Sequence, residues 1–250
     1  MIKFFRKIRY DLMEKNKTGK YIKYGIGEIV LVVIGILIAL SINNWNDSRK
    51  LEQKKQELVL GLIDDFEENI VKLKSSIERS NLSENQMNEF IKNAYASDLM
   101  ISVDSLKTLS KGFFRVTRFF TSLTTYEEAK SNGSLSLLKS KELSKSFTEF
   151  LTSYNDNLVV QDQSANSYFN GSLWELKKTL GSLGVITGLN KNRFNLKTQN
   201  IDSFRELINS PLVIANFENR YILNANIYRT LKEMETISRD IVKELNKLKK

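Results

Sequence analysis

The sequence predicts an all-α protein: one N-terminal transmembrane helix followed by a long-helix antiparallel bundle of three or more helices with coiled-coil-like packing. Three observations lead to this fold class. The chain has 250 residues but only one proline and eleven glycines, so little interrupts long helices. An apolar run near the N-terminus is long enough to cross a bilayer. Apolar residues then recur at near-heptad spacing over much of the remaining chain.

The composition removes several classes of site. The chain contains no cysteine and no histidine. Disulfides, Cys/His zinc sites and the Cys–His and Ser–His–Asp nucleophile arrangements are therefore excluded. We expect no cofactor, no metal and no enzymatic activity. The net charge is +9, but the charges after the first 28 residues are mixed and form no basic stripe, so we expect no nucleic-acid partner.

Residues 1–24 form a basic segment that precedes the membrane helix. Ile2, Phe5, Ile8 and Leu12 fall on one helical face, with lysines and arginines elsewhere. The pattern fits an amphipathic helix on an anionic leaflet, and it equally fits a charged tail without fixed structure.

Residues 25–45 are predicted to span the membrane. Eleven of the fourteen residues from Ile29 to Ile42 are Ile, Leu or Val, so insertion gains on the order of 5 kcal/mol. Tyr21, Tyr24 and Trp45 suit the two interfaces. Basic residues are denser before the span than after it, which predicts a cytoplasmic N-terminus and an extracytoplasmic domain at 46–250. The alternative is a cleaved signal peptide, since Ala39-Leu40-Ser41 has the form of a cleavage site.

Small residues within this span suggest association between membrane helices. Gly27, Gly35 and Ala39 fall on one stripe, and Glu28 lies close to it. These residues predict a homo-oligomer or contacts with other membrane proteins, unless the glycines are incidental.

The domain at 46–250 reads as helices with predictable ends. A first helix should run to about residue 94, since apolar residues step by three and four from Val59 to Ile77. We expect short helices at 104–109 and 202–209, a helix from 141 with a break near Asn170-Gly171, and a loop at 181–200. Ser210-Pro211 should start a last helix that extends to Lys250 and packs antiparallel to the first.

The segment from Gly112 to Leu123 contains four phenylalanines and two arginines. Arg115 and Arg118 are candidate contacts for an anion or a partner. The alternative is a crossover whose rings pack into the core.

Two stretches resemble a known family. They are FFRKIRYDLMEKNKTGKYIKYGIGEIVLVVIGILIALSINNWNDSRK near the N-terminus and TTYEEAKSNGSLSLLKSKEL from Thr124 to Leu143. Both resemble domain-of-unknown-function family six-zero-nine-zero, a group of Gram-negative membrane proteins. The resemblance implies a membrane anchor and a helical domain, and with the charge asymmetry an inner-membrane protein with a periplasmic domain. It supplies no catalytic residue. Within the second stretch, Thr125 and Glu128 have capping-box form, and Gly133 can end the short helix.

Two functions compete. The first is a membrane-anchored, non-enzymatic helical domain that acts as a scaffold or as a partner-binding or sensing module, in contact with the lipid bilayer and with other membrane or periplasmic proteins. The second is a carboxylate-dependent enzyme at the membrane surface. Its candidate residues are Asp64, Asp65, Glu67, Glu68, Glu127 and Glu128.

Overall fold

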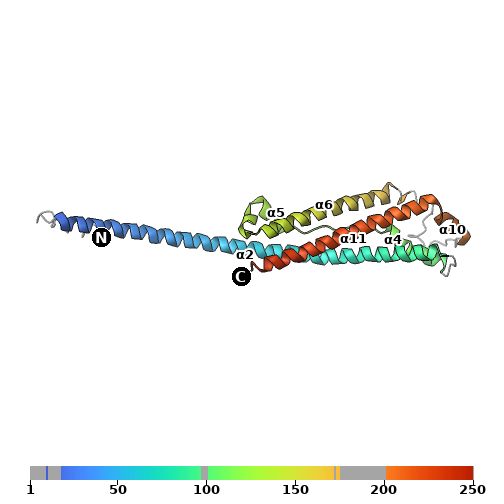
Figure 1. Ribbon diagram of the computed structural model, residues 1–250, viewed down its shortest axis with the longest axis horizontal. Coiled ribbons are helices and arrows are strands. Elements are labelled where there is room, and N and C mark those ends of the chain that lie inside the picture. Colours follow the sequence, from blue (N-terminus) through green and yellow to red (C-terminus); the bar gives the residue numbers. More distant parts are fainter. Residues whose placement is uncertain (1–9, 11–17, 97–100, 172, 175–200, 250) are drawn as a thin grey trace, which may run out of the picture. The chain divides into compact units, whose positions relative to one another are not determined.

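The computed structural model describes residues 10, 18–96, 101–171, 173–174 and 201–249, and over these residues the protein is helical without strands (Figure 1). The chain divides into two compact units, Met1–Lys55 and Gln56–Lys250. The predicted fold class is confirmed.

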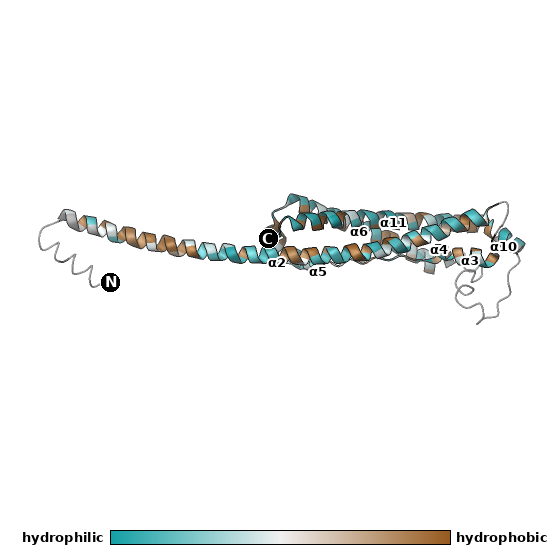
Figure 2. Ribbon diagram, turned by 90° about the horizontal axis from the view of Figure 1, so that it is seen from below, coloured by the Kyte–Doolittle hydropathy of each residue, from teal (hydrophilic) through white to brown (hydrophobic). Residues whose placement is uncertain are grey.

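The first unit is dominated by the N-terminal part of α2, a helix that runs from Thr18 to Ala94. The large apolar side chains from Ile29 to Ile42 are 47–69% exposed, and Figure 2 shows this stretch as strongly hydrophobic. Among the described residues, α2 is the one helix long and apolar enough to cross a membrane. It continues without a break through Asn46 and Asp47, so neither residue caps a separate helix.

The second unit contains the C-terminal part of α2 and the remaining helices. Extended chain at residues 115–123 separates α4 from α5. The described elements after α2 are α3 (Val103–Leu109), α4 (Lys111–Phe114), α5 (Thr124–Ser131), the 3₁₀ helix η1 (Ser134–Leu138), α6 (Lys141–Phe169), α10 (Ile201–Ile208) and α11 (Pro211–Asn246).

Local sequence accounts for most of these boundaries. The Ser140 side chain caps α6 by accepting a hydrogen bond from the Leu143 amide, and Ser210 caps α11 in the same way, with Pro211 in the first turn. The expected break after α6 is present at Asn170, and α11 ends at Asn246, slightly before the predicted end.

The three long helices of the second unit do not all run in the same direction. In Figure 1, α11 runs antiparallel to α2, as predicted, whereas α6 runs parallel to α2. The extended segment 115–123 explains this direction, because it carries the chain back along α2 before α6 begins.

The interior of the second unit has two apolar clusters. The first lies where residues 58–77 of α2 meet the start of α6 and the C-terminal half of α11, and it contains Leu62, Phe66, Phe150 and Leu231. The second lies where the end of α2 meets α4 and the start of α11, and it contains Phe90, Phe113 and Phe217. The phenylalanine pairs in these clusters have ring centroids 4.2–5.7 Å apart, so the rings pack directly against one another.

A buried polar layer lies between the two clusters. It contains Ser80 and Ser83 of α2, Asn157, Gln161 and Ser164 of α6, and Arg220, Asn224 and Thr230 of α11. Asn224 exchanges hydrogen bonds with Ser80, donating to its carbonyl at 3.2 Å and accepting from its hydroxyl at 3.1 Å. Asn157 donates to the Thr230 hydroxyl at 2.6 Å and accepts from Gln161. Asn224 thereby pairs α11 with α2.

Glycine permits a close approach of α4 to α2. A β-carbon added to Gly112 would lie 2.6 Å from the Ser83 carbonyl oxygen and 2.9 Å from Cβ of Gln86. Any larger residue at this position would therefore push α4 away from α2.

Several predictions lie outside the described residues: the amphipathic helix within 1–14, the loop at 181–200 and the interfacial side chains of Tyr21 and Tyr24.

Candidate functional site

An apolar groove runs between the C-terminal end of α2 and the N-terminal part of α11. Its volume is about 710 Å³. Helix α2 contributes Asn88, Ile91 and Tyr95. Helix α11 contributes Ile214, Phe217, Glu218, Tyr221 and Ile222. The groove is thus built from segments more than one hundred positions apart in the sequence.

Helical spacing places these residues on facing stripes. On α2, Asn88, Ile91 and Tyr95 step by three and four positions, as residues on one face of a helix do. On α11, Ile214, Glu218 and Ile222 step by four. Phe217 forms the floor, since it is only 4% exposed and packs into the second apolar cluster.

The walls of the groove remain accessible to solvent. Ile91 is 38% exposed, Ile214 37% and Ile222 57%. Tyr95 is fixed at one end, because its hydroxyl donates a hydrogen bond of 2.8 Å to the Ile208 carbonyl. Burial raises the pKa of Tyr95, which keeps the phenol protonated and able to donate.

The charge on the groove is acidic. Glu218 belongs to its lining, and Glu84, one turn before Asn88, lies 3.5 Å from the Tyr221 hydroxyl. Among the described residues that line the groove there is no lysine or arginine. Lys92 lies nearby on α2 but pairs with Glu89 at 3.9 Å. The groove is therefore an apolar surface bordered by carboxylates on a chain whose net charge is +9.

The structure does not bring the two predicted arginines into one pocket. They lie in the extended segment after α4, where odd-numbered residues turn inward and even-numbered ones outward. Thr117 and Phe119 are buried, whereas Arg118 and Phe120 are exposed. Arg115 is half-buried, and its Nη1 is buried without a hydrogen-bond partner. Phe119 thus fits the expected crossover packing, and the arginines lie apart on two faces.

The backbone of this crossover is held by three buried side chains. Asn69 of α2 binds Ser122 through its amide, with both N–O distances 2.7 Å, and Gln161 of α6 binds the Phe119 backbone at 3.1 and 3.2 Å. Arg220 of α11 donates to the carbonyls of Phe113 and Arg115, both at 2.8 Å. These side chains supply the partners that a neighbouring strand would give an extended segment.

Arg220 is the most unusual ionisable group of the second unit. It is 2% exposed, and its third hydrogen bond, of 2.6 Å, goes to the Ser164 hydroxyl. No carboxylate of the described residues pairs with it. Burial lowers the pKa of Arg220 to about 10, so the guanidinium stays charged at neutral pH. The sequence did not identify Arg220 as a buried residue, because the heptad pattern of α11 was traced through its apolar residues alone.

The small residues proposed for membrane-helix association lie in the first unit. Gly27, Gly35 and Ala39 are exposed, and a β-carbon on either glycine would meet nothing within 4 Å. The stripe is therefore open to a neighbouring helix, and Glu28 lies beside it, half-buried.

The carboxylates proposed for catalysis have other roles or face solvent. Asp65 accepts hydrogen bonds from the amides of Thr125 and Tyr126, at 2.8 and 3.4 Å. Glu68 pairs with Lys72 at 2.8 Å, and that contact lowers the pKa of Glu68. Glu127 and Glu128 are exposed. Within the described ranges no group of three His, Cys, Asp or Glu side chains could hold a metal ion.

The Asp65 contact corrects the predicted capping box at Thr125. Helix α5 begins at Thr124 and has no side-chain cap from within its own sequence. Asp65, sixty positions earlier, takes that role instead, and it can do so because Gly61 lets α5 approach α2 closely. The predicted end of this helix is confirmed, since Gly133 follows α5 with a φ of 76°. Tyr126 and Ala129 form the buried face of α5, and Glu127 and Lys130 are exposed.

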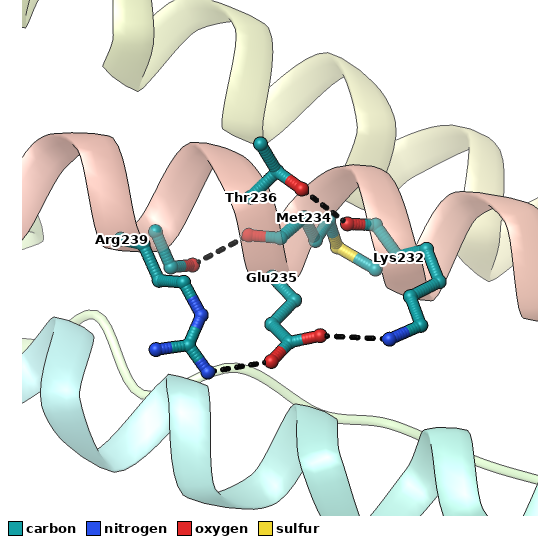
Figure 3. Close-up of polar contacts among 6 residues, drawn as sticks. Lys232, Met234, Glu235, Thr236 and Arg239 are labelled. Atoms are coloured by element: carbon teal, nitrogen blue, oxygen red, sulfur yellow. Dashed lines mark hydrogen bonds and ion pairs between the residues drawn. The ribbon is translucent and has the colours of Figure 1, made fainter.

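A second polar cluster on α11 is satisfied internally. Figure 3 shows Glu235 between Arg239 and Lys232, with contacts of 2.7 and 3.3 Å. The contacts with Arg239 and Lys232 lower the pKa of Glu235. A shallow depression of about 480 Å³ beside Arg239 includes Glu67, Ile70 and Lys243. Its lining carries both acidic and basic side chains, so it does not favour a ligand of either charge.

Fold and surface together define an all-helical protein with one long apolar helix near its N-terminus and a helical bundle that carries an acidic apolar groove. The chain matches the model of a family of unknown function, DUF6090, over residues 28–208. It belongs to this family, and the resemblance drawn from the sequence is confirmed. Comparisons with curated proteins and with solved structures gave no match.

Proposed function

We propose that this protein is a membrane-anchored, non-enzymatic helical bundle that binds partner proteins, as a scaffold or as part of a sensing assembly. The observation that carries the proposal is the exposed apolar surface of α2 between Ile29 and Ile42. A continuous face of this size is costly in water and favourable in a bilayer.

The membrane would be the inner membrane of a Gram-negative bacterium, with the N-terminus in the cytoplasm and the second unit in the periplasm. The basic residues before the span support this orientation. The family assignment gives no activity, so the partner-binding role rests on the surface of the bundle.

Two features of the bundle support binding rather than catalysis. The carboxylates considered for an enzyme cap a helix, pair with lysine or face solvent. The largest apolar concavity described above is an open groove, which suits a macromolecular partner better than a substrate that must be enclosed.

Membrane extraction tests the anchor. The intact protein should stay in the membrane pellet after alkaline carbonate treatment and should be released by detergent. A matched variant with Ile34→Asp and Ile38→Asp should be released by carbonate, because charges near the centre of a span oppose insertion. If the parent chain is released by carbonate, or if its mature form starts near Ile42, the anchor is wrong.

A further inference from the structure

We infer that the groove between α2 and α11 binds a cationic amphipathic helix of a partner protein. This inference rests on the proposed partner-binding function and names the chemistry of the partner.

The length of the groove fits a short helix. The α2 stripe from Glu84 to Tyr95 covers twelve residues, or about 17 Å and about three helical turns. A helix laid along it would place apolar residues at intervals of three and four positions against Ile91, Ile214 and Ile222. Phe217 would form the base of the contact.

The exposure of the walls argues against a small ligand. Small-molecule sites enclose most of their ligand's surface. Here Ile91, Ile214 and Ile222 are each more than a third exposed, which leaves a broad apolar surface to be covered. A partner helix covers such a surface along its whole length.

The acidic border of the groove favours a partner helix with positive charge. Glu218 lies in the lining, Glu84 continues the α2 stripe towards the Tyr221 hydroxyl, and the described lining residues include no cation. Carboxylates beside an apolar groove attract lysines and arginines on the flanks of a bound helix and repel acidic helices and anionic lipid headgroups. A cationic amphipathic helix satisfies both the apolar floor and the acidic border.

Site-specific photo-crosslinking on the full chain tests the inference. A benzophenone amino acid replaces Ile91 in the groove or, as a control, Leu82 on the opposite face of α2, which is also exposed. The chain is placed in nanodiscs of zwitterionic phosphatidylcholine. The probe is a model helix of leucine and lysine about four turns long, with a leucine–glutamate helix as its counterpart.

We expect the lysine peptide to crosslink at position 91 and not at position 82. Reversing the groove charge with Glu84→Lys and Glu218→Lys should weaken this crosslinking about tenfold and should create crosslinking by the glutamate peptide. The matched control, Glu57→Lys with Asp240→Lys, changes exposed carboxylates outside the groove and should behave like the parent. Equal melting temperatures show that the variants remain folded.

Three results would overturn the inference. The first is equal crosslinking of the lysine peptide at positions 91 and 82. The second is crosslinking at position 91 whose yield is unchanged by Glu84→Lys and Glu218→Lys. The third is a product at 91 with a second copy of the chain or with lipid when peptide is absent. Carbonate extraction of the same variants reports the membrane anchor separately, so failure of the groove and failure of the anchor are distinguishable.

Discussion

At the scale of single residues, the bundle depends on polar side chains that bind backbone. Arg220, Gln161 and Asn69 each join a long helix to the extended segment between α4 and α5. Their partners are carbonyl and amide groups that would otherwise be buried without hydrogen bonds. These residues lie at helical positions where a heptad pattern predicts apolar side chains, which is why the sequence alone did not identify their role.

Replacement of Arg220 tests this view. Arg220→Met should lower the free energy of unfolding by about 3 kcal/mol, because three acceptors lose a charged donor. Arg220→Lys should recover little of that loss, since one ammonium cannot reproduce the geometry of three guanidinium nitrogens. Arg229→Met, at an exposed position of the same helix, should change stability by less than about 0.5 kcal/mol. Denaturant unfolding of the full chain in detergent measures all three, and equal losses for Arg220→Met and Arg229→Met would contradict the account.

The left-handed conformation of Gly133 gives a second test at this scale. Gly133→Val should lower stability by roughly 1 kcal/mol or more, because a β-branched residue is strained at positive φ. No neighbour lies within 4 Å of an added β-carbon, so this cost is conformational rather than steric. Glu127→Gln, in the same segment but exposed, should melt like the parent. If the two variants exchange these behaviours, the segment is a functional site and not a helix end.

At the scale of elements, ion pairs on α11 give stability that depends on pH. The contacts of Glu235 with Arg239 and Lys232 lower the pKa of the Glu235 carboxyl from its ordinary 4.5. A carboxyl with a lowered folded pKa stabilises the fold above its ordinary pKa, and this stabilisation is lost as the pH falls through the lowered value.

Glu235→Gln should therefore lower the melting temperature at pH 7, by an amount that corresponds to less than about 1 kcal/mol, and should change it little near pH 3. Glu233→Gln is the control, because Glu233 has one exposed pair at 3.4 Å and should show a smaller difference. A Glu235→Gln effect that is the same at both pH values would show that its ion pairs do not contribute.

The membrane helix makes its own prediction at this scale. Gly35→Ile should reduce self-association in bilayers if the stripe of Gly27, Gly35 and Ala39 packs against a second helix, because the larger side chain separates the backbones. Gly25→Ile changes a glycine of α2 on the other side of the helix, two positions from Gly27, and serves as the control. Förster transfer between labelled chains in vesicles measures association, and unchanged transfer with Gly35→Ile would exclude the stripe as a dimer contact.

Helix ends were predictable where the cause is local. Pro211 with Ser210 fixes the start of α11, and Asn170-Gly171 fixes the end of α6. The start of α5 was not predictable, because its cap is Asp65 on another helix. The groove was also beyond sequence reasoning: Ile91 and Ile222 look like ordinary surface positions until α2 and α11 are known to lie side by side.

At the scale of the whole molecule, the two proposed roles, anchoring and recognition, belong to different units of the chain. The first unit supplies an apolar helix whose surface suits lipid, and the second supplies a bundle with an acidic apolar groove. The central proposal is that the protein is held in a membrane with its bundle on the outer side. The sequence predicted the span and its orientation from hydropathy and basic flanks alone.

Accessibility of single cysteines tests this claim most directly, since the natural chain has none. One variant carries Lys130→Cys, at an exposed position of α5, and the other carries Lys15→Cys in the basic N-terminal segment. A membrane-impermeant maleimide is applied to intact bacterial spheroplasts and, in parallel, to lysed ones. The account predicts that Lys130→Cys reacts in intact spheroplasts and that Lys15→Cys reacts only after lysis. The reverse pattern, or reaction of both cysteines only after lysis, would contradict it.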